Sequence, residues 1–170
     1  MPELTTKERL QPSLLDRLTD DQPDQRQESR ETRVLSMLHL RKSVLRDLAW
    51  LLNTGNLASC EDIDDYPLVA RSVVNYGIPN FSGLTLAGLS KQALEAALKQ
   101  AIIDFEPRIL RDSVRVHGAM VEGAMSRNAI GFVIEGDLWG QPFSSQLYLR
   151  TEVDLESGHF TVAEMAGAGR

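Results

Sequence analysis

The amino-acid sequence predicts an α+β fold, with a helical N-terminal half packed on a small antiparallel sheet in the C-terminal half. Apolar residues recur at helical spacing in residues 34–52 and 90–105, whereas from Ile130 to Leu155 apolar and polar residues alternate as in strands. The change between the two patterns falls at Glu106-Pro107-Arg108. Proline disfavours the helical conformation of the residue before it, so the second long helix should end at about Phe105.

Residues 1–33 are polar and predict a flexible arm. Inside the arm, Leu14, Leu15 and Leu18 form an isolated apolar cluster, and Ser13 is a suitable N-cap, which together predict a short helix near residues 13–19. So short a helix is marginal alone and must dock to persist. It docks either on its own domain or on a partner; in the second case the three leucines are the anchors.

Residues 34–165 are predicted to form one α+β domain, whose first long helix spans residues 34–52 and ends in the glycine-containing segment 53–56. Its predicted inner face consists of Val34, Leu35, Leu38, Val44, Leu45, Leu48, Ala49 and Leu52, with Arg46 and Asp47 on the wet side. The acidic loop 61–65 lacks the glycine and the terminal glutamate of an EF-hand and is interpreted as a solvated loop. A short helix follows in residues 66–73, with Pro67 in its first turn, and residues 75–80 form a turn around Gly77.

After Arg108 the sequence predicts extended chain from Ile109 to Val121 and then two or three further antiparallel strands. Segments 130–138 and 147–155 alternate cleanly, and a last short strand follows the turn at Glu156-Ser157-Gly158. Residues 166–170 should form a disordered tail.

The composition excludes several functional classes. With 42% hydrophobic residues, 25% charged residues and a formal net charge of −6, the chain offers no electrostatic attraction to nucleic acid or anionic lipid. No apolar run is long enough to span a bilayer, so no membrane insertion is expected. The single cysteine and the absence of a visible secretion signal favour a cytoplasmic protein.

The sequence contains few candidates for catalysis. His39, His117 and His159 share no ligand spacing with Cys60, so neither a metal site nor a cofactor is predicted, and Cys60 is interpreted as a partly buried, inert thiol. Carboxylates are numerous enough that a glycosidase pair is not excluded by counting. As a general acid, however, Glu106 would need a raised pKa, which Arg108 would oppose.

Glu106, Pro107 and Arg108 allow two interpretations. They form either a helix stop with a local ion pair or a contact with a partner. The carboxylate of Glu106 has the wrong sign for the C-terminal end of a helix dipole, and this conflict favours the partner contact.

Five segments in a fixed order carry a family resemblance: 13–18 (SLLDRL), 43–54 (SVLRDLAWLLNT), Tyr66-Pro67, 72–79 (SVVNYGIP) and 105–108 (FEPR). The chain resembles the TssE family, the baseplate subunits of type VI secretion systems, which are homologous to a wedge protein of contractile phage tails. The likeness covers roughly residues 10–163. Asn80 departs from the acidic residue that the family often has there, which affects only a loop contact.

The resemblance implies a structural baseplate protein that is not an enzyme, although the family was long labelled lysozyme-like. It implies partners TssF, TssG and TssK in the baseplate, with Glu106, Pro107 and Arg108 contacting the TssF–TssG core bundle. It also implies a contact with the first ring of the sheath proteins TssB and TssC, and a location in the cytoplasm in a baseplate docked at the inner membrane. Two alternatives remain open, a peptidoglycan-cleaving enzyme and the baseplate wedge protein of a phage tail.

Overall fold

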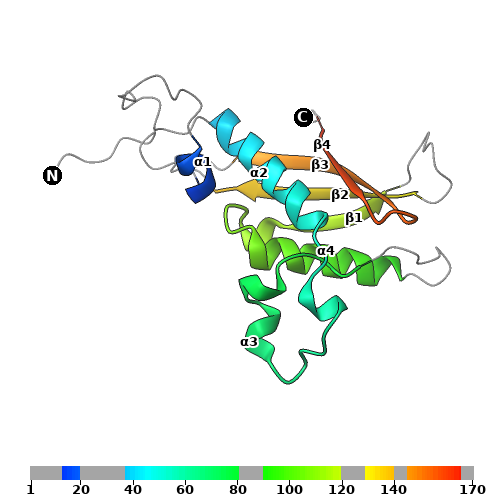
Figure 1. Ribbon diagram of the computed structural model, residues 1–170. Helices are drawn as coiled ribbons and strands as arrows, with labels where there is room; N and C mark the ends of the chain where they lie inside the picture. The colour runs from blue at the N-terminus through cyan, green and yellow to red at the C-terminus, as the bar shows by residue number, and fades with distance from the viewer. Residues whose placement is uncertain (1–12, 20–36, 81–89, 120–128, 140–144, 166–170) are drawn as a thin grey trace.

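Helices and a four-stranded antiparallel sheet divide the chain as the sequence predicted, so the α+β fold class is confirmed (Figure 1). The computed structural model describes residues 13–19, 37–80, 90–119, 129–139 and 145–165. Predictions for residues 1–12, 20–36 and 166–170 therefore lie outside the described residues, including most of the polar arm and the tail.

The helical half contains α1 (Leu14–Leu18), α2 (Met37–Leu52), α3 (Pro67–Ala70) and α4 (Lys91–Phe105), with 3-10 turns η2 (Leu57–Ser59) and η3 (Val73–Asn75) around α3. Ser13 caps α1 by accepting a hydrogen bond from the backbone N–H of Asp16, and Ser90 caps α4 in the same way through Ala93. The short helix predicted for residues 66–73 is divided, because the chain leaves the helix after Ala70 and re-enters a turn at Val73.

The sheet has the strand order β1-β2-β3-β4, formed by β1 (Arg115–Ala119), β2 (Ala129–Leu138), β3 (Ser145–Asp154) and β4 (Phe160–Glu164). Continuous extended chain from Ile109 was a wrong prediction. A 3-10 turn, η4 (Arg111–Ser113), interrupts it, and the Ser113 hydroxyl accepts a hydrogen bond from the Asp137 N–H at 2.8 Å. This bond holds the turn against β2.

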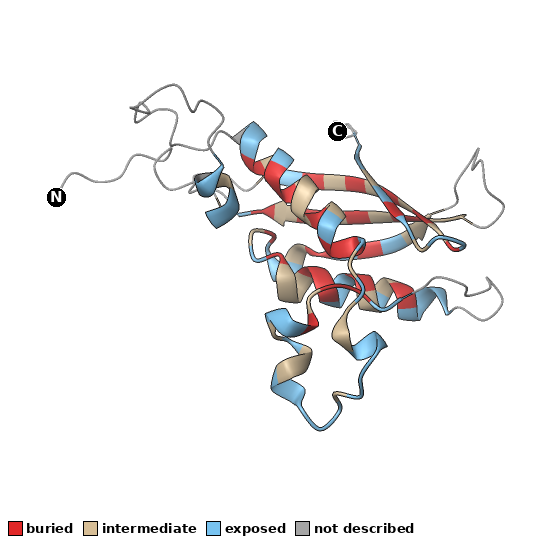
Figure 2. Cartoon of the chain, in the orientation of Figure 1, coloured by how far each residue is buried: buried red, intermediate tan, exposed pale blue. Residues whose placement is uncertain are grey.

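One face of the sheet is buried beneath the two long helices (Figure 2). α2 packs against β4 and α4 packs along β1, and the buried side chains of the strands alternate as the sequence predicted. The core side chains shared by helices and sheet include Val44, Leu48, Leu98, Ile102, Phe132, Ile134, Leu149 and Phe160. Leu38 was wrongly placed on the inner face: it is exposed near the start of α2, whereas Leu40 and Leu51 are buried.

The two outer strands are bounded differently. On β1, the backbone N–H of Gly118 donates to the Glu95 carboxylate of α4 at 2.7 Å, so the helix covers this edge. Among the described strands β4 pairs only with β3, and the Asn53 side chain at the end of α2 donates to Phe160 O and accepts from Phe160 N–H, both at 2.9 Å. No helix in the described part of the chain is long and apolar enough to cross a bilayer.

The turn at Gly77 follows η3 in the chain and packs against the residues just after α2, and this close approach requires glycine. The φ of Gly77 is +124°, and an added Cβ would overlap the carbonyl oxygen of Thr54. The same segment is fixed by two hydrogen bonds, from Ile78 N–H to Thr54 O at 2.9 Å and from Asn56 N–H to Ile78 O at 3.0 Å.

Gly77→Ala is therefore expected to lower the free energy of unfolding by about 1–3 kcal/mol, because alanine strains this backbone conformation. Urea denaturation monitored by circular dichroism measures the change. Gly55→Ala is the matched control, since a Cβ there meets nothing within 4 Å. Equal stability of the two variants would contradict the assigned turn conformation.

Candidate functional site: an ionic cluster with exposed leucines

Glu106 follows α4 directly, and its carboxylate is bound by the nearby Arg108. Nε and Nη2 of Arg108 donate to Oε1 and Oε2 of Glu106 at 2.7 and 2.5 Å, and the Arg108 backbone N–H donates to Oε1 at 3.1 Å. Glu106 is only 3% exposed. α4 ends at Phe105, as the proline predicted, and Glu106 is its C-cap residue.

Arg108 also reaches the other long helix. Its Nη2 donates to Oδ2 of Asp47 on α2 at 2.6 Å, and its Nη1 is buried without a hydrogen-bond partner in the described residues. A planar guanidinium group can bind two carboxylates at once, because it binds one of them bidentately and still has a nitrogen that donates to the second. Arg108 thus joins the end of α4 to the middle of α2.

The charge network continues from Asp47 to α1. Arg46 contacts Oδ1 of Asp47 through Nε at 2.8 Å and donates through Nη1 to Oδ1 of Asp16 at 2.7 Å. The guanidinium also lies over the ring of Trp50, 5.0 Å from its centroid, as in cation–π contacts. We call the five connected charged residues the ionic cluster: Asp16, Arg46, Asp47, Glu106 and Arg108.

The cluster shifts the pKa values of its members. Burial alone would lower the pKa of Arg108, but the hydrogen bonds and charges of Glu106 and Asp47 raise it above its ordinary value. Burial would likewise raise the pKa of Asp16, yet hydrogen bonds from Ser13 and Arg46 lower it. Beside the cluster, burial and the charges of Asp47 and Glu106 raise the pKa of Tyr76. Arg108 therefore keeps its charge throughout the pH range in which proteins fold.

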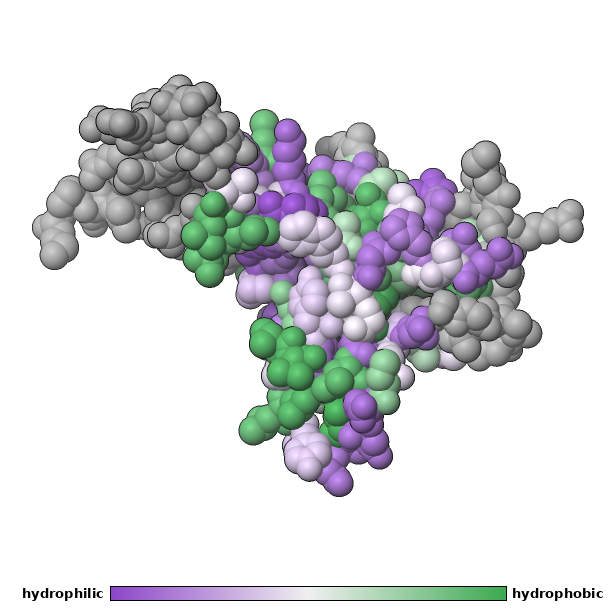
Figure 3. Space-filling view, viewed as in Figure 1, coloured by the Kyte–Doolittle hydropathy of each residue, from purple (hydrophilic) through white to green (hydrophobic). Residues whose placement is uncertain are grey.

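The leucines of α1 do not enter the domain core. Leu14 and Leu18 are 71% and 74% exposed, and Leu15 is 43% exposed. Figure 3 shows the resulting apolar region over α1, next to polar surface. In the described residues Asp16 links α1 to α2, through its ion pair with Arg46 and a hydrogen bond with Ser43. The structure therefore separates the side of α1 that docks on its own chain from the apolar side that remains open.

The sequence prediction of this site was incomplete in two respects. The ionic cluster connects the leucines of α1 to the segment Glu106-Pro107-Arg108. Its central members, Arg46 and Asp47, were predicted to lie on the solvent-exposed side of the helix. The charge conflict at Glu106 is resolved within the chain by Arg108, so that conflict no longer favours a partner contact. A signal that could have identified Asp16, Arg46 and Asp47 is their position inside the segments that carry the family resemblance.

The remaining candidates give no metal site in the part of the chain that the structure describes. No group of three or more histidine, cysteine, aspartate or glutamate side chains there is placed to hold a metal ion. Residues 61–65 are solvated, as expected, whereas Cys60 is exposed and was wrongly predicted to be partly buried.

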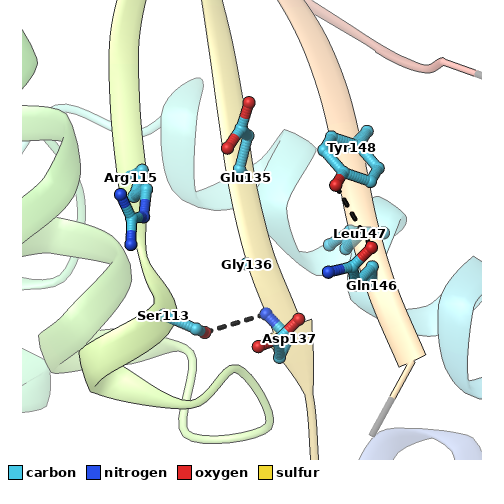
Figure 4. A pocket seen from close by; sticks show the side chains of 8 residues that line it. All are labelled: Ser113, Arg115, Glu135, Gly136, Asp137, Gln146, Leu147 and Tyr148. Carbon is cyan, nitrogen blue, oxygen red and sulfur yellow. Dashed lines mark hydrogen bonds between the residues drawn. The ribbon is translucent and has the colours of Figure 1, made fainter. Parts of the chain in front are cut away.

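A polar pocket lies between β1, β2 and β3 (Figure 4). Arg115, Glu135 and Tyr148 line it from three neighbouring strands, and Asp137 lies two residues further along β2. Tyr148 donates to the Gln146 side chain at 3.2 Å. Glycosidases use a pair of carboxylates, and Glu135 and Asp137 are the pair that lines this pocket. These two residues are therefore the ones to substitute in a test for glycosidase activity.

The link between Asp16 and Arg46 is expected to weaken in acid. The pKa of Asp16 is lowered in the folded state. The ionised carboxylate therefore stabilises the docked α1 fully at pH values above the ordinary aspartate pKa of about 3.9. This stabilisation is lost as the pH falls through the lowered pKa, so α1 should undock in that range. The ¹³C shift of the Asp16 carboxyl group and ¹⁵N relaxation of residues 13–19 measure this. Asp16→Asn should show an undocked α1 at every pH. A carboxyl group that titrates at its ordinary pKa would contradict the ion pair.

The chain is a small α+β domain in which the exposed leucines of α1 lie beside a set of ion-paired charges, and exposed apolar side chains of this kind are a feature of domains that bind other proteins.

The family model described as baseplate wedge protein gp25 matches residues 38–142, and the chain belongs to this family. The expected relation to baseplate subunits is thereby confirmed at the level of the family, and the chain has a structural role in the baseplate of a contractile tail-type system. No curated protein and no solved structure gives a significant match to the chain.

Proposed function

We propose that the protein is a non-enzymatic baseplate adaptor of a type VI secretion machine, which joins the core bundle of the baseplate wedge to the first ring of the contractile sheath. Family membership supports a baseplate role in general. The observation that carries the finer proposal is the ionic cluster, because it ties the exposed leucines of α1 through α2 to the segment Glu106-Pro107-Arg108.

On the wedge side, the proposed partners are TssF and TssG, which TssK accompanies in the same baseplate. Leu14, Leu15 and Leu18 supply exposed apolar area for this contact, and removing that area from water favours binding. The segment Glu106-Pro107-Arg108 takes part as a rigid unit. Both carboxylate oxygens of Glu106 and two guanidinium nitrogens of Arg108 are already held by hydrogen bonds within the chain. A preorganised segment loses little conformational entropy on binding.

On the sheath side, the proposed partners are TssB and TssC, and β4 supports this assignment. An outer strand with an unpaired edge accepts an added strand through backbone hydrogen bonds. α4 covers the edge at β1, whereas on β4 the Asn53 side chain binds only Phe160, and no second strand lies beside the rest of β4 in the described residues. In this proposal the protein lies in the cytoplasm, in a baseplate docked at the inner membrane and not inserted in it.

Co-expression of the tagged full-length chain with TssF and TssG of the same organism tests the proposal. We expect the three proteins to purify as one complex. Purification of the chain alone, with TssF and TssG forming their complex without it, would contradict the assignment. If phage wedge proteins replace TssF and TssG in the complex, the protein belongs to a phage tail with the same mechanism.

Peptidoglycan cleavage is not expected, because Glu106 is buried and both its carboxylate oxygens accept hydrogen bonds from Arg108. The purified chain should release no more soluble fragments from bacterial cell walls than Glu106→Gln or the double variant Glu135→Gln/Asp137→Asn. Hydrolysis that either variant abolishes would show that the protein is an enzyme and would identify its carboxylate.

A further inference from the structure

A second apolar surface lies on the α3 region, away from α1. We call it the α3 surface; its members are large apolar side chains that are mostly exposed, namely Tyr66, Leu68, Val73 and Val74. Leu68 and Val73 are 88% and 82% exposed, more than any leucine of α1. Figure 3 shows apolar side chains gathered over α3, separated in this view from the apolar region over α1. Contiguous exposed apolar area of this kind marks interaction sites.

The backbone beneath the α3 surface is fixed from inside. The buried side chain of Asn75 accepts a hydrogen bond from Ala58 N–H at 2.9 Å and donates to Ala70 O at 2.8 Å. Arg71 is joined to Asp104 of α4 at 3.2 Å. The apolar side chains are therefore presented in a defined arrangement, which reduces the conformational entropy lost when a partner binds.

The charges beside this surface are negative. Glu61, Asp62, Asp64 and Asp65 are all exposed, and they directly precede Tyr66, whose N–H donates to Ile63 O at 2.9 Å. The nearby positive charge of Arg71 is compensated by Asp104. The α3 surface therefore has an acidic border on the side of residues 61–65.

The acidic border decides between the possible occupants. Anionic lipid would be repelled by four exposed carboxylates. Two copies of this chain that paired symmetrically through the α3 surface would bring identical acidic loops into one interface, and like charges oppose such pairing. A different protein that presents apolar side chains between lysine or arginine residues satisfies both the apolar centre and the negative border.

We propose that the α3 surface docks such a basic, apolar segment of another protein in the same assembly, in a contact separate from that of the ionic cluster and the α1 leucines. The inference rests on the proposed function only in taking the partner from the baseplate or the sheath. It gives the adaptor a further contact that neither the family nor the ionic cluster assigns.

The test uses the full-length chain and three purified preparations: TssF–TssG, TssK and TssB–TssC. Leu68→Ser/Val73→Ser should raise the Kd for one of them at least tenfold without changing the melting temperature, because both side chains are almost fully exposed. Asp64→Asn/Asp65→Asn should weaken the same complex, most strongly at low salt. Leu38→Ser, another exposed apolar position, is the matched control and should bind like the wild type.

Unchanged Kd values for all three preparations would overturn the inference. Self-association, or adsorption to phosphatidylserine vesicles, that is lost in Leu68→Ser/Val73→Ser would also contradict it, since the occupant would then be a second copy or a membrane. If instead the proposed function is wrong, substitution of the α1 leucines and of Arg108 should leave TssF–TssG binding unchanged. The α3 variants alone would then lose a partner.

Discussion

Arg108→Ala is expected to abolish binding to TssF and TssG while leaving a folded chain. The substitution removes the group that holds Glu106 and Asp47, and Glu106 is 3% exposed. Breaking a fully buried pair costs about 3–5 kcal/mol, and partial solvent access to Arg108 should reduce the loss to about 1–3 kcal/mol in the free energy of unfolding. Urea denaturation and titration of the variant with TssF–TssG measure the two effects separately.

Arg108→Lys is the matched control for this prediction. It keeps the positive charge but lacks the planar fork that binds Glu106 and Asp47 together, so it should recover stability only in part. A variant Arg108→Ala that unfolds would show that Arg108 acts only in stabilising the domain. A variant that joins the complex with wild-type affinity would show that the interface assignment is wrong.

Simultaneous replacement of Leu14, Leu15 and Leu18 by serine should also weaken binding, but with almost no loss of stability. Because these side chains are exposed and α1 is held by Asp16, the melting temperature should change by no more than ~1 °C. Loss of buried anchors typically costs roughly 2 kcal/mol or more, so the Kd for TssF–TssG should rise about thirtyfold or more. Differential scanning calorimetry and isothermal titration measure these quantities.

Leu38→Ser controls for a general loss of exposed apolar area, since Leu38 is exposed on α2 outside α1. A large fall in melting temperature for the triple variant would show that the leucines belong to the domain core. Normal binding of the triple variant would remove α1 from the interface.

Much of the fold was predictable because it depends on local periodicity. The alternation in β2 and β3 and the end of α4 before Pro107 follow from side-chain spacing and from proline sterics, and the structure agrees with them. The η4 turn was missed because it is fixed by Ser113 and Asp137, which are separated by 24 positions in the chain.

The site was less predictable, because its charges pair over long sequence distances. Arg46 and Asp16 are 30 residues apart, and Arg108 and Asp47 are 61 residues apart. The adjacent charges Arg46 and Asp47 would look the same in the sequence if they only faced solvent. The sequence therefore does not show that they bind α1 and the segment after α4. Only the arrangement of α1, α2 and α4 in space shows that Arg46 and Asp47 connect the leucines of α1 to Arg108.

In the proposed function, α1 and the segment after α4 form one contact with the wedge bundle. Hydrogen exchange of the full-length chain, alone and saturated with TssF–TssG, tests it most directly. We predict increased protection in residues 13–19 and at the amides of Glu106 and Arg108 in the complex, with both changes lost together in Arg108→Ala. Protection confined to the sheet or to the α3 surface, with residues 13–19 unchanged on binding, would show that α1 takes no part in this contact.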